Sequence, residues 1–345
     1  MRVALHDNYF SERGTTTSIR QYSKYLKEFF GYETVLIHNR LSSSNDEVIV
    51  NEIKEDDEVF GYSNIKELDM FLRNESIDIL YAQKEGRRDH LAAIKTPSIV
   101  HAVFQFSDPH GSEYVYVSSW LARRMRWHIK SRLRCLHEHP NLRTVAQVVS
   151  NFGHNFGYLP LIVDQFVNTD GFREEFGIPS DAYVIGTLCG PDSFDIQFVR
   201  ERIPALLEQE KDVFFLFPNI TPFLDHDRVV FLPKIVDRSM KFAYLSALDC
   251  FLHARRLGES FGLGICEAMS AGVPVVSWRG GSDRHHVDLL SEVGGLYSDG
   301  ADFVQKIGQI RSCPTDPKIL QEKVREFSPE RVAAKFNDLI VSALR

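Results

Sequence analysis

The sequence predicts an α/β protein built from two doubly wound, Rossmann-like domains. Its 345 residues are too many for one ordinary core and suit two domains. Short apolar runs alternate with helical patterns, as expected for parallel sheets with helices on both faces. This alternation starts again after the segment 163–180, which contains asparagine, glycine and proline.

The elements follow a strand-then-helix order in each half. In the first half we expect strands at 2–5, 34–38, 77–81, 98–104 and 114–118, and helices at 18–30, 64–74 and 120–136. In the second half we expect strands at 182–188, 213–217, 228–232, 248–253 and 274–277, and helices at 198–208, 238–246, 263–271 and 301–310.

The expected domains are 1–165 and 166–328, with a hinge at about residue 165 and a last helix, within 329–345, that packs back on the first domain. Two such domains carry ligand crevices at the carboxyl ends of their strands, and we expect these crevices to face a central cleft.

Composition excludes several classes of protein. A net charge of −7 makes nucleic acid a poor partner for the whole molecule. The five cysteines are scattered and form no Cys-x-x-Cys pair, so the sequence indicates neither a zinc site nor a disulfide framework. The amino terminus becomes polar too soon for a signal peptide, and no apolar run approaches the roughly 20 residues that span a bilayer. We therefore expect a cytoplasmic protein.

The segment 258–274 carries the clearest chemistry. A strand leads into a glycine-rich loop, and a helix begins near Gly262 or Leu263, where free N–H groups can hold an anion. Ser260 is placed to cap this helix. Glu259 precedes the helix and Glu267 lies just over one turn inside it, so one carboxylate can face a sugar while the other reaches the cis-diol of a ribose.

This segment resembles the Glu-(seven residues)-Glu signature of the retaining GT-B glycosyltransferases, the group of glycogen synthase and the phosphatidylinositol mannosyltransferases. The flanking residues 244–253 and 267–276 agree with it, and the match extends over 228–278. The resemblance implies a GT-B fold and retaining transfer of a sugar from a nucleotide-sugar donor to a glycan or lipid-linked acceptor. We also expect that neither a metal nor a cofactor takes part.

The resemblance also implies roles for single residues. Glu259 would act on the donor sugar in catalysis, and Glu267 would bind the ribose. Sugar hydroxyls and phosphate would be held by the backbone N–H groups of the loop residues Ser260, Phe261, Gly262 and Leu263. The turn after the strand 228–232 would hold the base through Pro233, Lys234 and Ile235, although an ordinary turn explains these three residues equally well.

The loop 8–18 resembles the family's glycine loop, which faces the donor from the first domain. Gly14 permits a tight turn, and Thr15 to Thr17 offer hydroxyls and helix-start N–H groups. A plain strand-to-helix loop is the alternative. Retaining relatives often keep a histidine at the end of the fourth strand, near the transferred sugar, and His101 or His110 could fill that place. A core or loop histidine with no catalytic part is the favoured interpretation of each.

Two further features concern residues of the second domain. We interpret His285 and His286 as structural residues at the start of a helix. Relatives usually carry an Arg and a Lys after the first strand of the second domain to neutralise the diphosphate, but no basic residue lies between the strand 182–188 and Arg200 here. Arg255 and Arg256 are the nearest substitutes, and helix N-termini with Lys234 are the alternative.

The helix 120–136 is basic and amphipathic and carries no acidic residue. It could dock on anionic lipid or on an anionic acceptor, or it could simply present a solvated basic face. A glycosyltransferase is thus the leading function. A nucleotide-sugar epimerase on the same fold and a non-catalytic sugar-nucleotide binder remain as alternatives.

Overall fold

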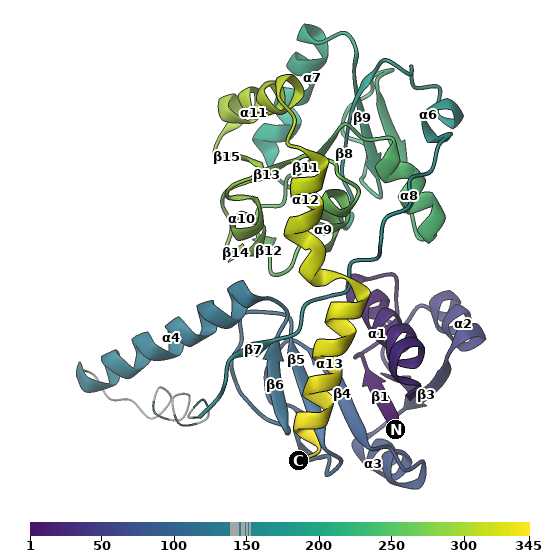
Figure 1. Cartoon of the computed structure of the whole chain (residues 1–345), viewed down its shortest axis with the longest axis vertical. Coiled ribbons are helices and arrows are strands. Elements are labelled where there is room, and N and C mark those ends of the chain that lie inside the picture. The colour runs from purple at the N-terminus through teal and green to yellow at the C-terminus, as the bar shows by residue number, and fades with distance from the viewer. Residues whose placement is uncertain (139–144, 146–148, 150, 152) are drawn as a thin grey trace. The chain divides into compact units, whose positions relative to one another are not determined.

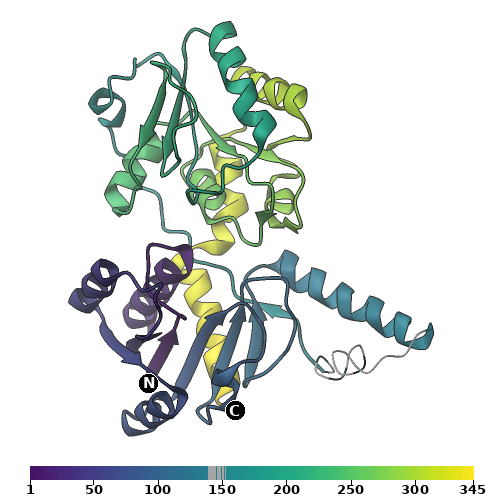
Figure 2. The ribbon, with the colours of Figure 1, turned by 180° about the vertical axis from the view of Figure 1, so that it is seen from behind.

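The computed structural model separates the chain into two compact units, seen from the front in Figure 1 and from behind in Figure 2. Unit 1 comprises Met1–Ile162 with Pro329–Arg345, and unit 2 comprises Val163–Ser328. The structure describes all residues except 139–144, 146–148, 150 and 152. Each unit contains its own parallel sheet, which confirms the predicted fold class of two doubly wound α/β domains.

Unit 1 contains a seven-stranded sheet in the order β3-β2-β1-β4-β5-β6-β7, and every neighbouring pair is parallel. The strands are β1 (Arg2–His6), β2 (Glu33–Asn39), β3 (Glu58–Tyr62), β4 (Ile79–Lys84), β5 (Ser98–Ala102), β6 (Glu113–Tyr116) and β7 (Gly157–Tyr158). The strand order reverses between β1 and β4, and such a switch point opens a crevice at the carboxyl ends of the strands.

Helices cover both faces of this sheet. They are α1 (Gly14–Phe30), α2 (Glu47–Asp56), α3 (Ile65–Asn74), η1 (His90–Ala93), α4 (Ser119–Glu138) and α13 (Pro329–Ala343). The last helix, α13, packs beside α1, where Phe336 meets the buried ring of Tyr22 at 5.1 Å between centroids. On the other face, Leu68 and Leu72 of α3 join a buried cluster with residues of β1, β2 and β4.

Strand β3 and helix α2 are absent from the sequence-based prediction. Strand β3 is an edge strand with mostly half-buried residues, so its sequence lacks the continuous apolar run of a central strand. Helix α2 is capped by Asp46, whose side chain accepts from the N–H groups of Val48 and Ile49. Since β3 precedes it in the chain, the segment 98–104, which we expected to be the fourth strand, is the fifth strand.

Unit 2 contains a six-stranded parallel sheet in the order β10-β9-β8-β11-β13-β15. Its strands are β8 (Tyr183–Gly186), β9 (Val213–Pro218), β10 (Val229–Leu232), β11 (Cys250–His253), β13 (Val275–Trp278) and β15 (Gly295–Tyr297). A separate parallel ribbon joins β12 (Gly258–Glu259) to β14 (Asp283–Arg284). Of these strands, the sequence analysis missed β12, β14 and the short edge strand β15.

The helices of unit 2 are α6 (Phe172–Glu175), α7 (Gln197–Gln209), α8 (Arg238–Ser246), α9 (Leu263–Ser270), α10 (His285–Leu290), α11 (Gly300–Ser312), α12 (Pro317–Val324) and η2 (Arg325–Phe327). Helices α7 and α11 close one buried cluster against the sheet, and α9 packs against α12 outside that cluster. The prediction of α8 is correct to the residue, whereas α12 was missed. The switch point of this sheet lies between β8 and β11, so the loops after these two strands border its crevice.

Candidate active site

Gly258 determines the path of the glycine-rich loop in unit 2. Its φ is +78°, and an added Cβ would lie 1.9 Å from the carbonyl oxygen of Asp283. This close approach pairs β12 with β14 and places Glu259 opposite Arg284. Only glycine fits such a position, because both the backbone conformation and the lack of space exclude a side chain. The backbone that carries Glu259 is therefore held in place before any ligand binds.

The carboxylate of Glu259 accepts two hydrogen bonds from neighbouring side chains. His253 Nε2 lies 3.3 Å from Oε1, and Arg255 Nη1 donates to Oε2 at 3.1 Å. Burial disfavours the charged carboxylate, but the hydrogen bond from His253 and the charges of His253 and Arg255 outweigh burial and lower the pKa of Glu259. About one fifth of the side chain remains exposed, so an ionised carboxylate is presented to a ligand.

Two histidines that the sequence analysis did not connect with Glu259 hold it in place. His286 Nδ1 accepts the backbone N–H of Glu259 at 3.2 Å, while its Nε2–H donates to the carbonyl of Trp278 at 2.8 Å. Burial lowers the pKa of His286 to about 3, so the ring is neutral and both of its nitrogens are used. His253 Nδ1 lies 2.8 Å from Ser277 Oγ. His253 ends a predicted strand, and this was the available sequence signal for it, whereas His286 follows a strand that the prediction lacked.

Helix α9 begins as predicted at Leu263, but the prediction that Ser260 caps it is wrong. The N-cap residue is Gly262, at φ +84°, and no side chain among the described residues bonds to the first N–H groups of the helix. These N–H groups are available to an anion because an α-helix leaves its first four donors without internal partners. The Phe261 side chain is buried and packs on His285 and Phe327, so only its backbone can serve a ligand.

Glu267 lies inside α9, as the sequence predicts, and faces the neighbouring helix α8. Lys241 Nζ of α8 donates to Glu267 Oε1 at 2.8 Å, and the two side chains are 23% and 15% exposed. The charge of Glu267 raises the pKa of Lys241 in spite of its burial. The carboxylate is therefore paired and remains partly accessible.

The loops after β8 and β11 are joined at the switch point. Asp195 Oδ1 accepts the backbone N–H of Arg256 at 2.6 Å. A Cβ at Gly264 would lie 2.7 Å from the carbonyl oxygen of Leu188, so α9 packs tightly on the loop after β8. Of the two arginines proposed for the diphosphate, Arg255 contacts Glu259, whereas Arg256 is tied to Asp195. Arg255 is thus the cation placed beside the candidate catalytic carboxylate.

The three residues expected at the base follow β10, an edge strand of the sheet. Pro233 is exposed, and Lys234 and Ile235 are half-buried. They lie at the same carboxyl edge as the glycine-rich loop, because every strand of this sheet runs in the same direction. Their assignment to the base rests on this strand order.

In unit 1, Gly14 and Thr15 are the first two residues of α1, which begins four residues earlier than predicted. A Cβ at Gly14 would meet open space, so no tight turn depends on this glycine. The loop is held instead by the buried carboxylate of Asp7, which pairs with Arg13 and accepts from Thr16 Oγ1. Burial raises the pKa of Asp7, and the charge of Arg13 opposes this effect. The loop is thus a charged cap on β1 rather than a glycine turn.

His101 does not occupy the position that the resemblance suggests. It lies in the fifth strand, β5, is fully buried, and bonds through Nδ1 to Tyr81 at 2.5 Å. Burial lowers its pKa to about 3, which keeps the ring neutral. The fourth strand ends at Gln83 and Lys84. Lys84 pairs with Asp89 at 2.5 Å, and its Nζ lies 3.3 Å from His110. The structure therefore favours a core role for His101.

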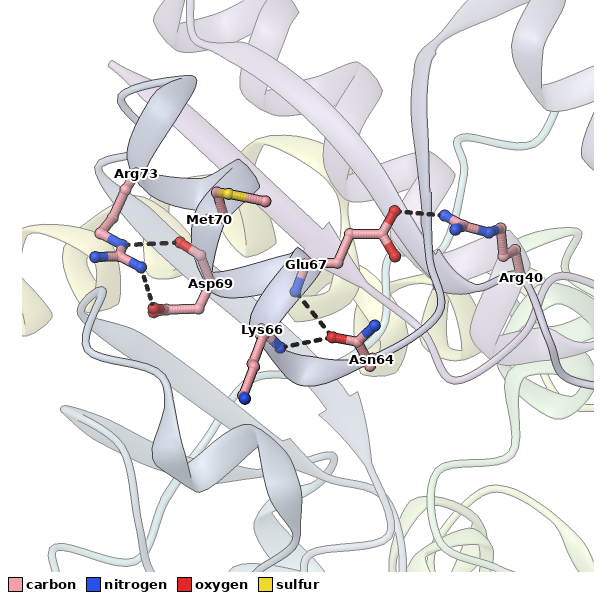
Figure 3. A pocket seen from close by; sticks show the side chains of 7 residues that line it. All are labelled: Arg40, Asn64, Lys66, Glu67, Asp69, Met70 and Arg73. Carbon is pink, nitrogen blue, oxygen red and sulfur yellow. Dashed lines mark hydrogen bonds and ion pairs between the residues drawn. The ribbon is translucent and has the colours of Figure 1, made fainter.

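A separate hollow of unit 1, of about 640 Å³, lies along α3 (Figure 3). The charged side chains that line it are largely paired with one another. Arg40 contacts Glu67 at 2.6 Å, Arg73 contacts Asp69 at 2.8 Å, and Asn64 caps the helix. This hollow lacks the converging unpaired polar groups of a binding site.

Comparison with known proteins links the geometry of unit 2 to a family. Residues 184–312 match the family model described as "Glycosyl transferases group 1". The chain carries a glycosyltransferase domain. The match includes the loop after β8, the turn after β10 and the whole segment from His253 to Glu267. No curated protein sequence matches the chain.

Several solved glycosyltransferases share the fold along the whole chain. A glycosyltransferase from Rickettsia africae ESF-5 is 14% identical with a TM-score of 0.69, covering 100% of this chain and 98% of that one. Anabaena HepE in complex with UDP is 14% identical with a TM-score of 0.71, covering 99% and 100%. A mutant of S. aureus TarM in complex with Fondaparinux, alpha-GlcNAc-glycerol and UDP is 10% identical with a TM-score of 0.68, covering 98% and 99%. The glycosyltransferase fold of this chain is therefore GT-B.

Proposed function

We propose that this glycosyltransferase moves a sugar from a nucleotide-sugar donor to a glycan or lipid-linked acceptor, with retention of configuration and without a metal or a cofactor. The observation that carries the proposal is the ionised, accessible Glu259 beside the uncapped start of α9. A negative carboxylate suits the positive charge that develops on a sugar, and free N–H groups suit phosphate oxygens. The HepE and TarM structures were solved with UDP, which supports a nucleotide at this site.

Different residues of unit 2 hold different parts of the donor. Glu267 accepts the ribose hydroxyls, while the N–H groups at the start of α9 hold the diphosphate. Arg255 contacts Glu259 and can share its guanidinium with the leaving diphosphate, because its five N–H donors exceed what one carboxylate oxygen uses. The bond from the anomeric carbon to the diphosphate oxygen breaks, the acceptor oxygen bonds to the same face of that carbon, and the acceptor's hydroxyl proton passes to the departing diphosphate oxygen. This front-face path accounts for retention without a covalent enzyme intermediate.

Metal independence is consistent with where the acidic residues lie. The sequence contains one Asp-x-Asp triplet, Asp225-His226-Asp227, which is the metal motif of the other glycosyltransferase fold. It directly precedes β10 and so lies at the amino edge of the sheet, opposite the glycine-rich loop. This triplet cannot bridge a diphosphate held at the start of α9.

Turnover is expected to survive removal of divalent metals. Release of nucleoside diphosphate from a panel of UDP-, GDP- and ADP-sugars would be measured before and after EDTA treatment, with and without acceptor sugars. Equal rates are expected, because helix dipoles and Arg255 supply the positive charge. Loss of turnover in EDTA that Mg²⁺ or Mn²⁺ restores would contradict the mechanism. A wild-type protein that binds a donor but never releases its diphosphate would be a non-catalytic binder.

We further propose that α4 brings the enzyme to an anionic membrane surface, which suits a lipid-linked acceptor. Figures 1 and 2 both show α4 projecting away from the sheet of unit 1. Its exposed surface combines basic residues with Trp127 and Leu133, which are 60% and 50% exposed. This is the composition of helices that lie at a lipid interface. No helix of the described residues has the length and apolarity to cross a bilayer.

Replacing Arg124 and Lys130 of α4 with alanine is expected to weaken binding to phosphatidylglycerol vesicles about thirtyfold. Each basic residue near an anionic surface contributes about 1 kcal/mol, and two such contributions correspond to this factor. Co-sedimentation would measure the partition coefficient, with the double variant Lys54→Ala and Lys66→Ala as a charge-matched control on the same unit. Equal losses in both double variants, or equal binding to phosphatidylcholine vesicles, would contradict a role for α4.

A further inference from the structure

The pair formed by Lys241 and Glu267 lies at the centre of a chain of alternating charges. Lys241 forms a 2.8 Å bond to Glu267, and the negative charge of Asp164 raises the pKa of Lys241 further. Asp164 in turn pairs with Arg238 at 3.2 Å. Negative and positive side chains thus alternate from α9, through α8, to the segment that begins unit 2. The backbone of that segment also accepts a long hydrogen bond from Ser270 of α9, at 3.5 Å.

The geometry of the pair leaves acceptor capacity on the carboxylate. Lys241 occupies Oε1, and the structure gives Oε2 no bond to another described residue. A carboxylate offers about four acceptor sites, so a carboxylate paired through one oxygen can still accept both hydroxyls of a cis-diol. Without a cation nearby, a half-buried carboxylate would turn toward solvent, since burial disfavours its charge.

We propose that Lys241 is a positioning residue for nucleotide recognition. It holds Glu267 in a single orientation, so that Oε2 is directed to the ribose. The lysine touches the carboxylate and not the nucleotide, and it therefore acts only through Glu267. This inference rests on the proposed function, in which Glu267 binds the ribose. It assigns to α8 a part in discriminating ribose from deoxyribose.

The test is a double-mutant cycle between the two residues. The affinities of UDP, GDP and ADP would be measured by calorimetry for the wild type, Lys241→Met, Glu267→Ala and the double variant. With whichever diphosphate binds the wild type most tightly, Lys241→Met is expected to weaken binding about fivefold to tenfold. In the Glu267→Ala background the same change is expected to have no effect, because a residue that acts through Glu267 has nothing left to position.

A second readout separates positioning from a general loss of structure. The preference for the chosen diphosphate over its 2′-deoxy form is expected to fall in Lys241→Met and to return in Lys241→Arg, which keeps the positive charge. Lys306→Met, which removes a half-buried lysine of α11 in the same unit, is the matched control and is expected to bind like the wild type. Thermal unfolding of all variants would show that they are folded.

Two contrary results are distinguishable. If Lys241→Met weakens binding equally with and without Glu267, or leaves the ribose preference unchanged, Lys241 does not position Glu267 and the inference is wrong while the proposed function stands. If the folded wild type binds none of the three diphosphates, the proposed function itself is contradicted, and this inference with it.

Discussion

Replacing Glu259 with glutamine is expected to lower the turnover number about 100-fold, while nucleotide affinity changes little. Glutamine keeps the size of the side chain but removes the negative charge beside the breaking glycosidic bond. Losing one preorganised electrostatic group costs on the order of 10² in rate, and an interaction that strengthens in the transition state appears in kcat rather than in binding. Steady-state kinetics of donor turnover and calorimetry with the nucleoside diphosphate measure the two quantities separately.

The side chains around Glu259 also predict how turnover depends on pH. His253 and Arg255 hold the pKa of Glu259 below its ordinary value in spite of burial, so the group stays ionised as pH falls through the usual titration range of a glutamate, near pH 4. Its ionisation therefore causes no loss of wild-type kcat between pH 7 and pH 5. Glu292→Gln, which removes an exposed, lysine-paired carboxylate of the same unit, is the matched control.

Two outcomes would count against the role of Glu259. If Glu259→Gln abolishes nucleotide binding and leaves the rate of bound donor intact, the roles of Glu259 and Glu267 are reversed. If neither quantity changes in a folded variant, the segment around Gly258 serves only to shape the start of α9, and the proposed mechanism loses its main support.

Replacing Glu267 with alanine is expected to weaken nucleotide binding by at least about tenfold. The carboxylate lies on α9 beyond the helix start that holds the diphosphate, which is where a ribose would follow. Hydrogen bonds to a charged group are each worth roughly 1.5–3 kcal/mol, and 1.4 kcal/mol corresponds to a factor of ten in affinity. The released Lys241 is 23% exposed and can turn toward solvent, so the helix pair is expected to survive the change.

Calorimetry with the nucleoside diphosphate measures this loss, and the 2′-deoxy form shows whether it arises at the ribose. Glu201→Ala on α7 removes an exposed glutamate of the same unit and is expected to leave affinity unchanged. An unchanged affinity in folded Glu267→Ala would contradict the ribose assignment. A loss of equal size for the ribose and deoxyribose forms would place the contact elsewhere on the nucleotide.

The sequence by itself determined the elements that local patterns specify. The central strands of both sheets and helices such as α8 and α9 follow from continuous apolar runs and from the 3.6-residue period. The placement of Glu259 before a helix and Glu267 inside it also follows from spacing along the chain. The prediction lacked edge strands such as β3 and β15 because half-buried or very short strands do not show a continuous apolar run.

The tertiary structure decided which side chains meet, because those contacts join residues far apart in sequence. The structure contains the edge strand β3, which the prediction lacked, so the segment around His101 is the fifth strand of its unit, and His101 is fully buried in it. His286 accepts the backbone N–H of Glu259 from 27 residues away in the sequence, and Lys241 donates to Glu267 from 26 residues away. No local pattern encodes such distances. Only the packing of α8, α9 and the β12–β14 ribbon brings these groups within hydrogen-bonding reach. The spacing along the sequence therefore predicts the two glutamates, whereas only the tertiary structure identifies the residues that contact them.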